Sequence, residues 1–149
     1  TGGAAELLVL QGSKDADIVL VEGQGSINHP GYSGVTLSLL HGSCPDALIL
    51  CHQASREYIG EYRGEPWLRI PPLRDYVTMY EMIGSAVHPT KVIGISMNTY
   101  DLDDAAARKA CDDATRATGL PCTDPVRFDP APLLDPIVAA RSTKPVRTV

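Results

Sequence analysis

The sequence predicts a three-layer α/β fold, in which a mostly parallel sheet is covered by helices on both faces. Three apolar runs, at residues 18–21, 47–51 and 92–96, are short and rich in β-branched and aliphatic residues. Uninterrupted runs of this kind are typical of strands that are buried on both faces. Segments with helical patterns separate the runs, and strand–helix alternation places parallel strands side by side. We therefore expect three adjacent parallel strands whose carboxyl ends share one edge.

The helices are predicted from apolar spacing and from the residues that begin and end them. The clearest helix covers 73–83, where apolar residues follow the three-and-four spacing of an amphipathic helix. Another helix is expected at 101–118, with acidic residues near its beginning and Gly119 at its end. The remaining elements are expected as helices at 4–11, 35–40 and 130–140 and as a short last strand or extended segment at 120–126.

Length and composition indicate a single α/β domain over residues 1–149. Of these residues 44% are hydrophobic and 21% are charged, which suits one globular core. The net charge of −5 and the lack of a basic run argue against binding to nucleic acid or to a membrane surface. No apolar stretch approaches the roughly 20 residues that cross a bilayer, and no signal peptide is recognisable. We therefore expect a cytoplasmic protein that acts on a small molecule.

The four cysteines, Cys44, Cys51, Cys111 and Cys122, form no Cys-x-x-Cys pair. This spacing argues against a zinc cluster. Cys51 ends an apolar run, and we expect it to pack as a small hydrophobic residue in a reducing compartment.

A glycine-rich polar loop, the Glu22 loop (residues 22–30), follows the first apolar run. Glycines let backbone N–H groups approach an anion closely, and a carboxylate beside them can hold hydrated Mg²⁺. Ligands of open α/β sheets bind beyond the carboxyl ends of the strands, where this loop is expected. Its candidate site residues are Glu22, Gly23, Gln24, Gly25, Ser26, Asn28 and His29. An ordinary strand–turn–helix corner is the alternative, but the number of polar residues favours a functional loop.

Polar residues also follow the second and third apolar runs. His52 comes directly after one run, and Asn98 comes closely after the other. Because the carboxyl ends of parallel strands meet at one edge of a sheet, we expect His52 and Asn98 on the same edge as Glu22. Imidazole titrates near neutral pH, so His29 and His52 are candidate general bases. Glu22 is a candidate for the same role or for Mg²⁺ binding.

A long polar segment, residues 54–72, precedes the helix expected at 73–83. Long loops in compact domains often act as lids or binding loops. A simple surface excursion explains the segment equally well. Arg56 in this segment, together with Asn28 in the Glu22 loop, is a candidate for binding the substrate.

Four strings of the sequence resemble one known family. They are VEGQGSINHP at 21–30, LLHGS at 39–43, PDALILCH at 45–52 and VIGISMNT at 92–99. They are similar to the DUF1611 family, whose members join an amino-terminal Rossmann-like domain to a carboxyl-terminal P-loop domain and include D-glutamate N-acetyltransferases. The first string also resembles the EGAGG loop of dethiobiotin synthetases, in which the acid serves the Mg²⁺ of the nucleotide.

The resemblance implies a truncated fold of the P-loop NTPase type, because one expected motif is missing. No Gly-x-x-x-x-Gly-Lys-Ser/Thr sequence, which would cradle phosphates, occurs in the chain. The family pattern implies that this motif lies before Thr1. Residues 1–149 are then expected to be most of the carboxyl-terminal domain of a longer protein and to be inactive alone. The exposed edge of a truncated sheet would favour a homo-oligomer.

For the longer protein, the resemblance implies acetyl transfer from acetyl-CoA to D-glutamate or a similar amino acid, in D-glutamate catabolism. The residues then expected to bind the cofactor are Gly23, Gln24, Gly25, Ser26 and Asn98. A Mg-ATP-dependent ligase or kinase-like enzyme is the alternative, with Glu22 on Mg²⁺ and Asn98 near the nucleotide base. A non-catalytic binding or dimerisation domain is the third possibility.

Overall fold

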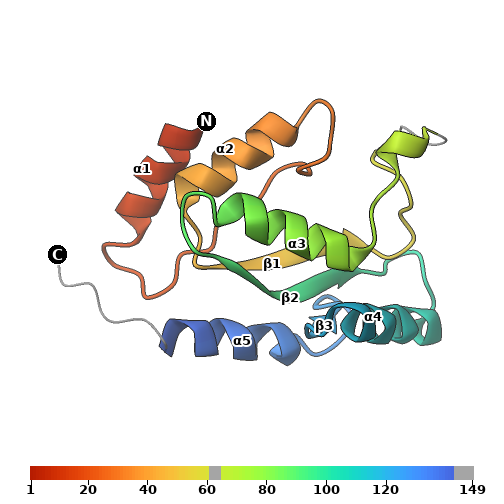
Figure 1. Cartoon of the computed structure of the whole chain (residues 1–149). Helices are drawn as coiled ribbons and strands as arrows, with labels where there is room; N and C mark the ends of the chain where they lie inside the picture. Colours follow the sequence, from red (N-terminus) through yellow and green to blue (C-terminus); the bar gives the residue numbers. More distant parts are fainter. Residues whose placement is uncertain (61–64, 143–149) are drawn as a thin grey trace. The chain divides into compact units, whose positions relative to one another are not determined.

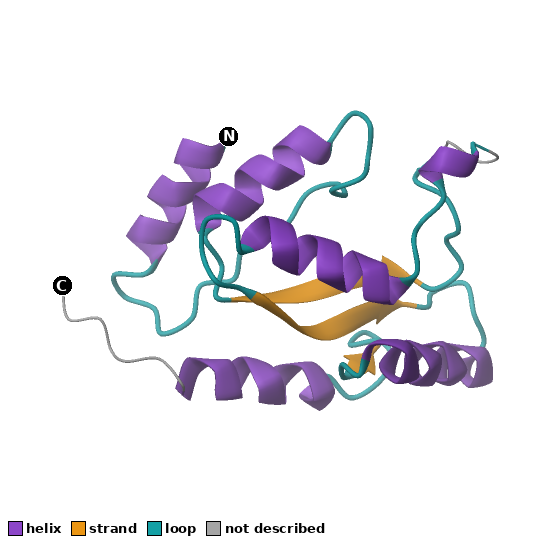
Figure 2. Cartoon of the chain, in the orientation of Figure 1, coloured by secondary structure: helices purple, strands orange, loops and turns teal. Residues whose placement is uncertain are grey.

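The structure, a computed structural model, describes residues 1–60 and 65–142 (Figure 1). Helices and strands follow one another in an α/β pattern (Figure 2), which confirms the predicted class. In chain order the elements are α1 (Gly2–Gly12), α2 (Ser33–Ser43), β1 (Ala47–Gln53), the 3-10 helix η1 (Pro66–Leu68), α3 (Leu73–Gly84), β2 (Lys91–Asn98), α4 (Asp104–Thr118), β3 (Cys122–Thr123) and α5 (Ala131–Ser142). No helix in this described part is both long enough and apolar enough to span a membrane.

The chain forms two compact units, each of which combines separate stretches of sequence. The first unit contains Thr1–Asp46, Glu57–Ile70 and Thr78–Thr90. The second contains Ala47–Arg56, Pro71–Val77 and the chain from Lys91 onward. The first unit therefore carries the Glu22 loop, and the second carries β1, β2 and β3.

The second unit contains a parallel sheet in the order β1–β2–β3. Gln53 of β1 pairs with Asn98 of β2, so these two strands end at the same edge. The short strand β3 pairs with β2 on its other side. The parallel pairing predicted for 47–51 and 92–96 is therefore confirmed, and β2 is the central strand.

Burial explains the central position of β2. Its side chains Val92, Ile95 and Met97 are buried, and Ile95 has no exposed surface. Helix α5 contacts all three strands, and α4 contacts β3. Gly94 permits the close approach of α5, because a Cβ atom there would lie 2.9 Å from Leu133 Cδ2. A continuous apolar run is what a strand under covering helices requires.

Helix α4 has clear signals at both ends. The Asp103 carboxylate accepts a backbone hydrogen bond in the first turn, which satisfies one of the N–H groups that a helix leaves unpaired. Gly119 ends the helix in the left-handed conformation, with φ 76°. The helix predicted at 101–118 is confirmed, but it begins at Asp104. Asp101 consequently lies in the turn before the helix.

In the first unit, α1 and α2 approach each other through glycines. A Cβ atom on Gly42 would lie 2.2 Å from the carbonyl oxygen of Gly2. Contact this close leaves no space for a side chain, so Gly42 is required by the packing of the two helices.

Residues 57–60 and 65–70, also in the first unit, pair with each other through their backbones. The N–H of Ile59 donates to the carbonyl of Leu68 at 2.9 Å, and both side chains are buried. Tyr58 and Arg69 form an antiparallel bridge beside this contact. Residues 61–64, between the paired positions, lie outside the described part of the chain.

The prediction of a strand at 18–21 is wrong. No strand of the described residues includes this run, and Ile18, Val19, Leu20 and Val21 are all exposed, Leu20 by 82%. A strand needs a neighbour that satisfies its backbone groups, and the described strands pair only with one another. The apolar composition showed that the run suits a strand but could not supply a partner. Glu22 therefore does not follow a strand.

Cys51 also differs from its prediction. Strand β1 buries Leu50 and exposes Cys51. Neighbouring side chains of a strand point to opposite faces, so the apolar character of the run did not determine the environment of its last residue.

Candidate functional site

In the first unit, Gly25 fixes the path of the Glu22 loop. Its φ of +71° lies in the left-handed region that favours glycine. A Cβ atom at Gly25 would lie 2.7 Å from the Cβ of Tyr32 and 3.3 Å from Oγ1 of Thr36. The Thr36 hydroxyl donates to the carbonyl of Gln24 at 2.7 Å. The loop is therefore packed against the beginning of α2, and Gly25 is needed for that packing.

The middle of the loop is held by side-chain contacts. Ser26 Oγ donates to Asn28 Oδ1 at 2.7 Å, and the N–H of Ile27 donates to the hydroxyl of Tyr80 at 3.2 Å. These bonds place the hydroxyl of Ser26 beside the amide of Asn28. Two adjacent polar groups of this kind are suited to a polar ligand.

His29 has a ring orientation that determines where its proton lies. Its Nδ1 accepts a hydrogen bond from the N–H of Gly31 at 3.0 Å, and its ring centroid lies 4.6 Å from that of Tyr32. A ring nitrogen that accepts carries no proton, so the neutral imidazole has its proton on Nε2. In this arrangement Nε2 is a donor, which suits stabilisation of negative charge better than proton abstraction.

Glu22 and Gly23 begin the loop and are exposed. A Cβ atom at Gly23 would meet no atom within 4 Å, so packing does not require this glycine. Within residues 1–60 and 65–142, no three His, Cys, Asp or Glu side chains form a metal-binding group. Mg²⁺ that is held mainly by water and phosphate oxygens needs only one or two carboxylates, and Glu22 fits that role.

In the second unit, β1 and β2 bring His52 and Asn98 to one edge, as the sequence predicted, with Gln53 paired to Asn98; Glu22 does not follow a strand of this sheet. The N–H of Ala54 donates to the carbonyl of Asn98 at 3.0 Å, which continues the pairing beyond the strand end. Burial, and after it the charge of Arg56, lower the pKa of His52 below its ordinary value. His52 is therefore neutral at pH 7 and able to accept a proton.

Hydrogen bonds link the two segments that follow β1 and β2. Gln53 Nε2 donates to Ser55 Oγ at 3.2 Å, and Ser55 Oγ donates to Asp101 Oδ2. Asn98 Oδ1 accepts from the N–H of Tyr100 at 3.1 Å. The carboxyl edge of the sheet is therefore an ordered polar surface.

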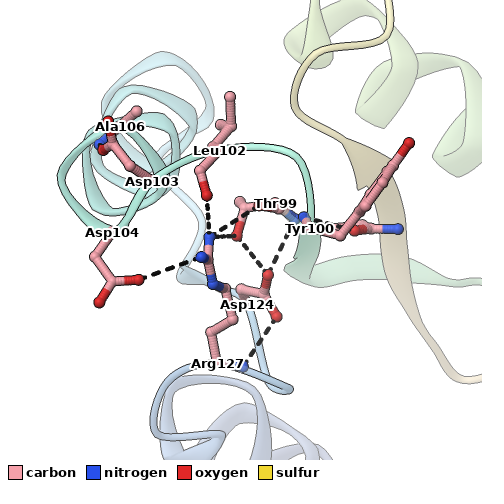
Figure 3. Close-up of polar contacts among 9 residues, drawn as sticks. Thr99, Tyr100, Leu102, Asp103, Asp104, Ala106, Asp124 and Arg127 are labelled. Atoms are coloured by element: carbon pink, nitrogen blue, oxygen red, sulfur yellow. Dashed lines mark hydrogen bonds and ion pairs between the residues drawn. The ribbon is translucent and has the colours of Figure 1, made fainter.

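Figure 3 shows a polar network next to this edge, the Arg127 network, formed by Thr99, Asp124 and Arg127. Asp124 Oδ2 accepts from the N–H of Thr99 at 3.0 Å and from its hydroxyl at 2.6 Å. Arg127 Nη1 donates to the carbonyls of Thr99 and Leu102, at 2.9 and 2.7 Å. Arg127 Nη2 lies 3.3 Å from Asp104 Oδ1. The network joins the end of β2, the segment after β3 and the beginning of α4.

Asp124 is a buried carboxylate that stays ionised. Only 3% of its surface is exposed. Burial alone would raise the pKa of Asp124, but hydrogen bonds from Thr99 and from the backbone N–H groups of Val126 and Arg127 hold it below its ordinary value. The two backbone groups donate to Oδ1 at 3.0 and 3.2 Å. Full hydrogen bonding therefore stabilises the charge at neutral pH.

The predicted site residues are divided between the two units. Glu22 to His29 belong to the first unit, whereas His52, Arg56 and Asn98 belong to the second. The residues that order the strand ends were not predicted, and they are Ser55, Thr99, Asp101, Asp124 and Arg127. Asp124 directly follows the last strand, Cys122–Thr123, but no apolar run marks it in the sequence.

Comparisons with known proteins identify the family. A model of DUF1611, described as a P-loop domain of unknown function, matches residues 1–134. Two curated relatives are named D-glutamate N-acetyltransferase: one from Pseudoalteromonas sp is 36% identical over 129 residues, and one from Tritonibacter scottomollicae is 39% identical over 121 residues. These matches cover 84% and 80% of this chain but 37% and 35% of the relatives. The chain thus spans little more than a third of their length.

A solved structure agrees with this assignment. The crystal structure of a DUF1611 family protein from Anabaena variabilis is 42% identical to the chain and superposes with a TM-score of 0.85. The similarity covers 93% of this chain and 40% of that protein. With the family model matched over most of its length, the chain belongs to the DUF1611 family.

Proposed function

We propose that this chain is part of an N-acetyltransferase, which transfers the acetyl group of acetyl-CoA to the amino group of D-glutamate or a similar amino acid. The observation that carries the proposal is the name shared by the two curated relatives, at 36% and 39% identity. Because the chain spans little more than a third of these relatives, the proposal concerns the complete protein that carries this sequence.

Acetyl transfer to an amine needs a base. The amine nitrogen bonds to the thioester carbonyl carbon, the carbon–sulfur bond breaks, the nitrogen loses a proton, and the sulfur leaves as the thiol or thiolate of CoA. His52 is the base that we favour, because burial keeps its imidazole neutral at pH 7. An imidazole with this property can accept the proton from the attacking amine.

The other candidate residues have complementary properties. In the first unit, the Nε2–H of His29 is a donor suited to an oxygen that carries negative charge. The N–H of the exposed Gly23, in the first unit, is suited to a phosphate group of acetyl-CoA. In the second unit, which also carries His52, the guanidinium of Arg56 is suited to a carboxylate of D-glutamate.

A Mg-ATP-dependent ligase or kinase-like enzyme is the second candidate. The description of the matching family model as a P-loop domain favours it. Glu22 would hold Mg²⁺, which neutralises phosphate charge when bound, and Asn98 would lie near the nucleotide base. This candidate needs a phosphate-binding loop, and residues 1–149 contain no Gly-x-x-x-x-Gly-Lys-Ser/Thr sequence.

An assay of the complete protein separates the candidates. With acetyl-CoA and D-glutamate, acetyl transfer should release free thiol, and EDTA should not abolish that release. ATP hydrolysis that EDTA stops, without thiol release, would contradict the proposal and support the second candidate. Neither reaction would indicate a binding or dimerisation domain.

A further inference from the structure

One turn of the second unit, residues 99–102, is restrained at both ends. The N–H of Leu102 donates to the carbonyl of Thr99 at 3.0 Å, which closes the turn. Arg127 donates to the carbonyl oxygens of both residues. Thr99 has no exposed surface, and its N–H and hydroxyl both donate to the carboxylate of Asp124 (Figure 3). The backbone of the turn is therefore fixed from inside the unit.

The side chains between these two ends face solvent. Tyr100 is 73% exposed, and Asp101 is also exposed. Asp101 Oδ2 accepts from Ser55, while its Oδ1 accepts no hydrogen bond from the residues that the structure describes. Ligands of open α/β sheets bind at this edge, beyond the carboxyl ends of the strands. A carboxylate that is held in place with one oxygen available is suited to an ammonium group.

We propose that Asp101 binds the ammonium group of the amino-acid substrate, and that Arg127 and Asp124 are positioning residues that hold its turn. The inference rests on the proposed function, which makes an amino acid the substrate. Arg127 Nη1 donates to the carbonyl oxygens at both ends of the turn. Stability alone does not require such a charged network, because apolar residues often stabilise a fold as well as buried charges do. The contacts of Arg127 with both ends of the turn therefore point to a role in holding the orientation of its backbone.

Substitution by lysine distinguishes positioning from simple stabilisation. In Arg127→Lys the positive charge stays near Asp104, but a single ammonium cannot reproduce the planar fork that reaches both carbonyls. Asp104→Asn removes only the outer ion pair, whose carboxylate is 78% exposed. Arg116→Ala is the matched control, because it removes an arginine that pairs with Asp113 on the surface of α4.

The experiment measures KM for both substrates, kcat and the thermal unfolding midpoint of the complete protein. Arg127→Lys and Asp101→Asn should each raise KM for D-glutamate about tenfold, the effect of losing one hydrogen bond to a charged group. KM for acetyl-CoA should stay the same in both variants. Asp104→Asn and Arg116→Ala should leave both KM values unchanged.

The outcomes separate this inference from the proposed function. An unchanged KM for D-glutamate in Arg127→Lys, even with a lower unfolding midpoint, would overturn the inference while acetyl transfer stands. If the wild-type protein releases no thiol, calorimetric affinity for D-glutamate replaces KM. Weaker binding by Arg127→Lys than by wild type would then support positioning although acetyl transfer fails. Absence of D-glutamate binding by the wild-type protein would overturn the inference as well.

Discussion

At the scale of single residues, two glycines of the Glu22 loop differ in what a side chain would meet. Gly25→Ala forces a Cβ atom to within 2.7 Å of Tyr32 at a positive φ, whereas Gly23→Ala meets open space. We expect Gly25→Ala to lower the free energy of unfolding by about 1–3 kcal/mol. Gly23→Ala should change it by less than about 0.5 kcal/mol. Urea denaturation of both variants measures the difference, and equal losses would contradict the packing role of Gly25.

His52 provides a second test at this scale. His52→Ala should lower kcat/KM of the complete protein by about 10²- to 10⁴-fold, the usual effect of losing a general base. A base must be unprotonated, so activity falls as pH drops through its pKa. Because burial and Arg56 lower the pKa of His52, the acid limb of the pH profile should lie below 6.5.

Arg56→Gln is the companion variant, since it removes the positive charge that helps to keep His52 neutral. The acid limb should then move to higher pH, toward the ordinary value for histidine. A pH–rate profile of kcat/KM measures this shift. If the fall of kcat/KM at low pH is the same in His52→Ala as in wild type, the group that titrates is not His52.

At the scale of elements, Asp124 links the end of β2 to the segment after β3, and it makes this link depend on pH. Its folded pKa lies below the ordinary 3.8, so its contribution to stability is complete above that pH and is lost as pH falls through the folded value. Asp124→Asn should lower the free energy of unfolding at pH 7 by about 2 kcal/mol, because an amide cannot accept from all four donors.

Urea denaturation between pH 7 and pH 3 measures this effect. Wild-type stability should fall more steeply below pH 4 than that of Asp124→Asn. Asp113→Asn is the matched control, since Asp113 is hydrogen bonded by Lys109 and Arg116 on the exposed face of α4. If the free energy of unfolding falls equally with pH in wild type and in Asp124→Asn, the carboxylate of Asp124 is not the cause of the loss of stability at low pH.

Elements were predictable where local sequence agreed with packing. Apolar spacing indicated α3 (Leu73–Gly84), and continuous runs indicated β1 and β2. The run at 18–21 has the same composition as these strands but lies exposed. Local composition measures how well a segment suits a strand, whereas strand formation depends on a neighbour that lies elsewhere in the sequence. Pairing was therefore the part of the fold that composition could not provide.

At the scale of the whole molecule, the sequence predicted which polar residues share the edge of the sheet, but it did not predict the contacts that support them. His52 and Asn98 were found because they come at or near the ends of apolar runs, and the strand register places them at one edge. The Arg127 network was not found, since it joins residues 99, 124 and 127, which are brought together only by β2–β3 pairing. Contacts between residues that are far apart along the chain leave no periodic pattern in the sequence.

The remaining prediction concerns the share of ligand binding that residues 1–149 provide. Phosphate groups are bound mainly by the backbone N–H groups and the lysine of a Gly-x-x-x-x-Gly-Lys-Ser/Thr loop, and these residues contain no such sequence. We therefore expect residues 1–149 alone to bind acetyl-CoA and ATP with dissociation constants above about 1 mM. Calorimetric titration of residues 1–149 and of the complete protein with each ligand measures these dissociation constants. Affinity of about 1 μM for either ligand in residues 1–149 would show that these residues recognise the phosphates without such a loop.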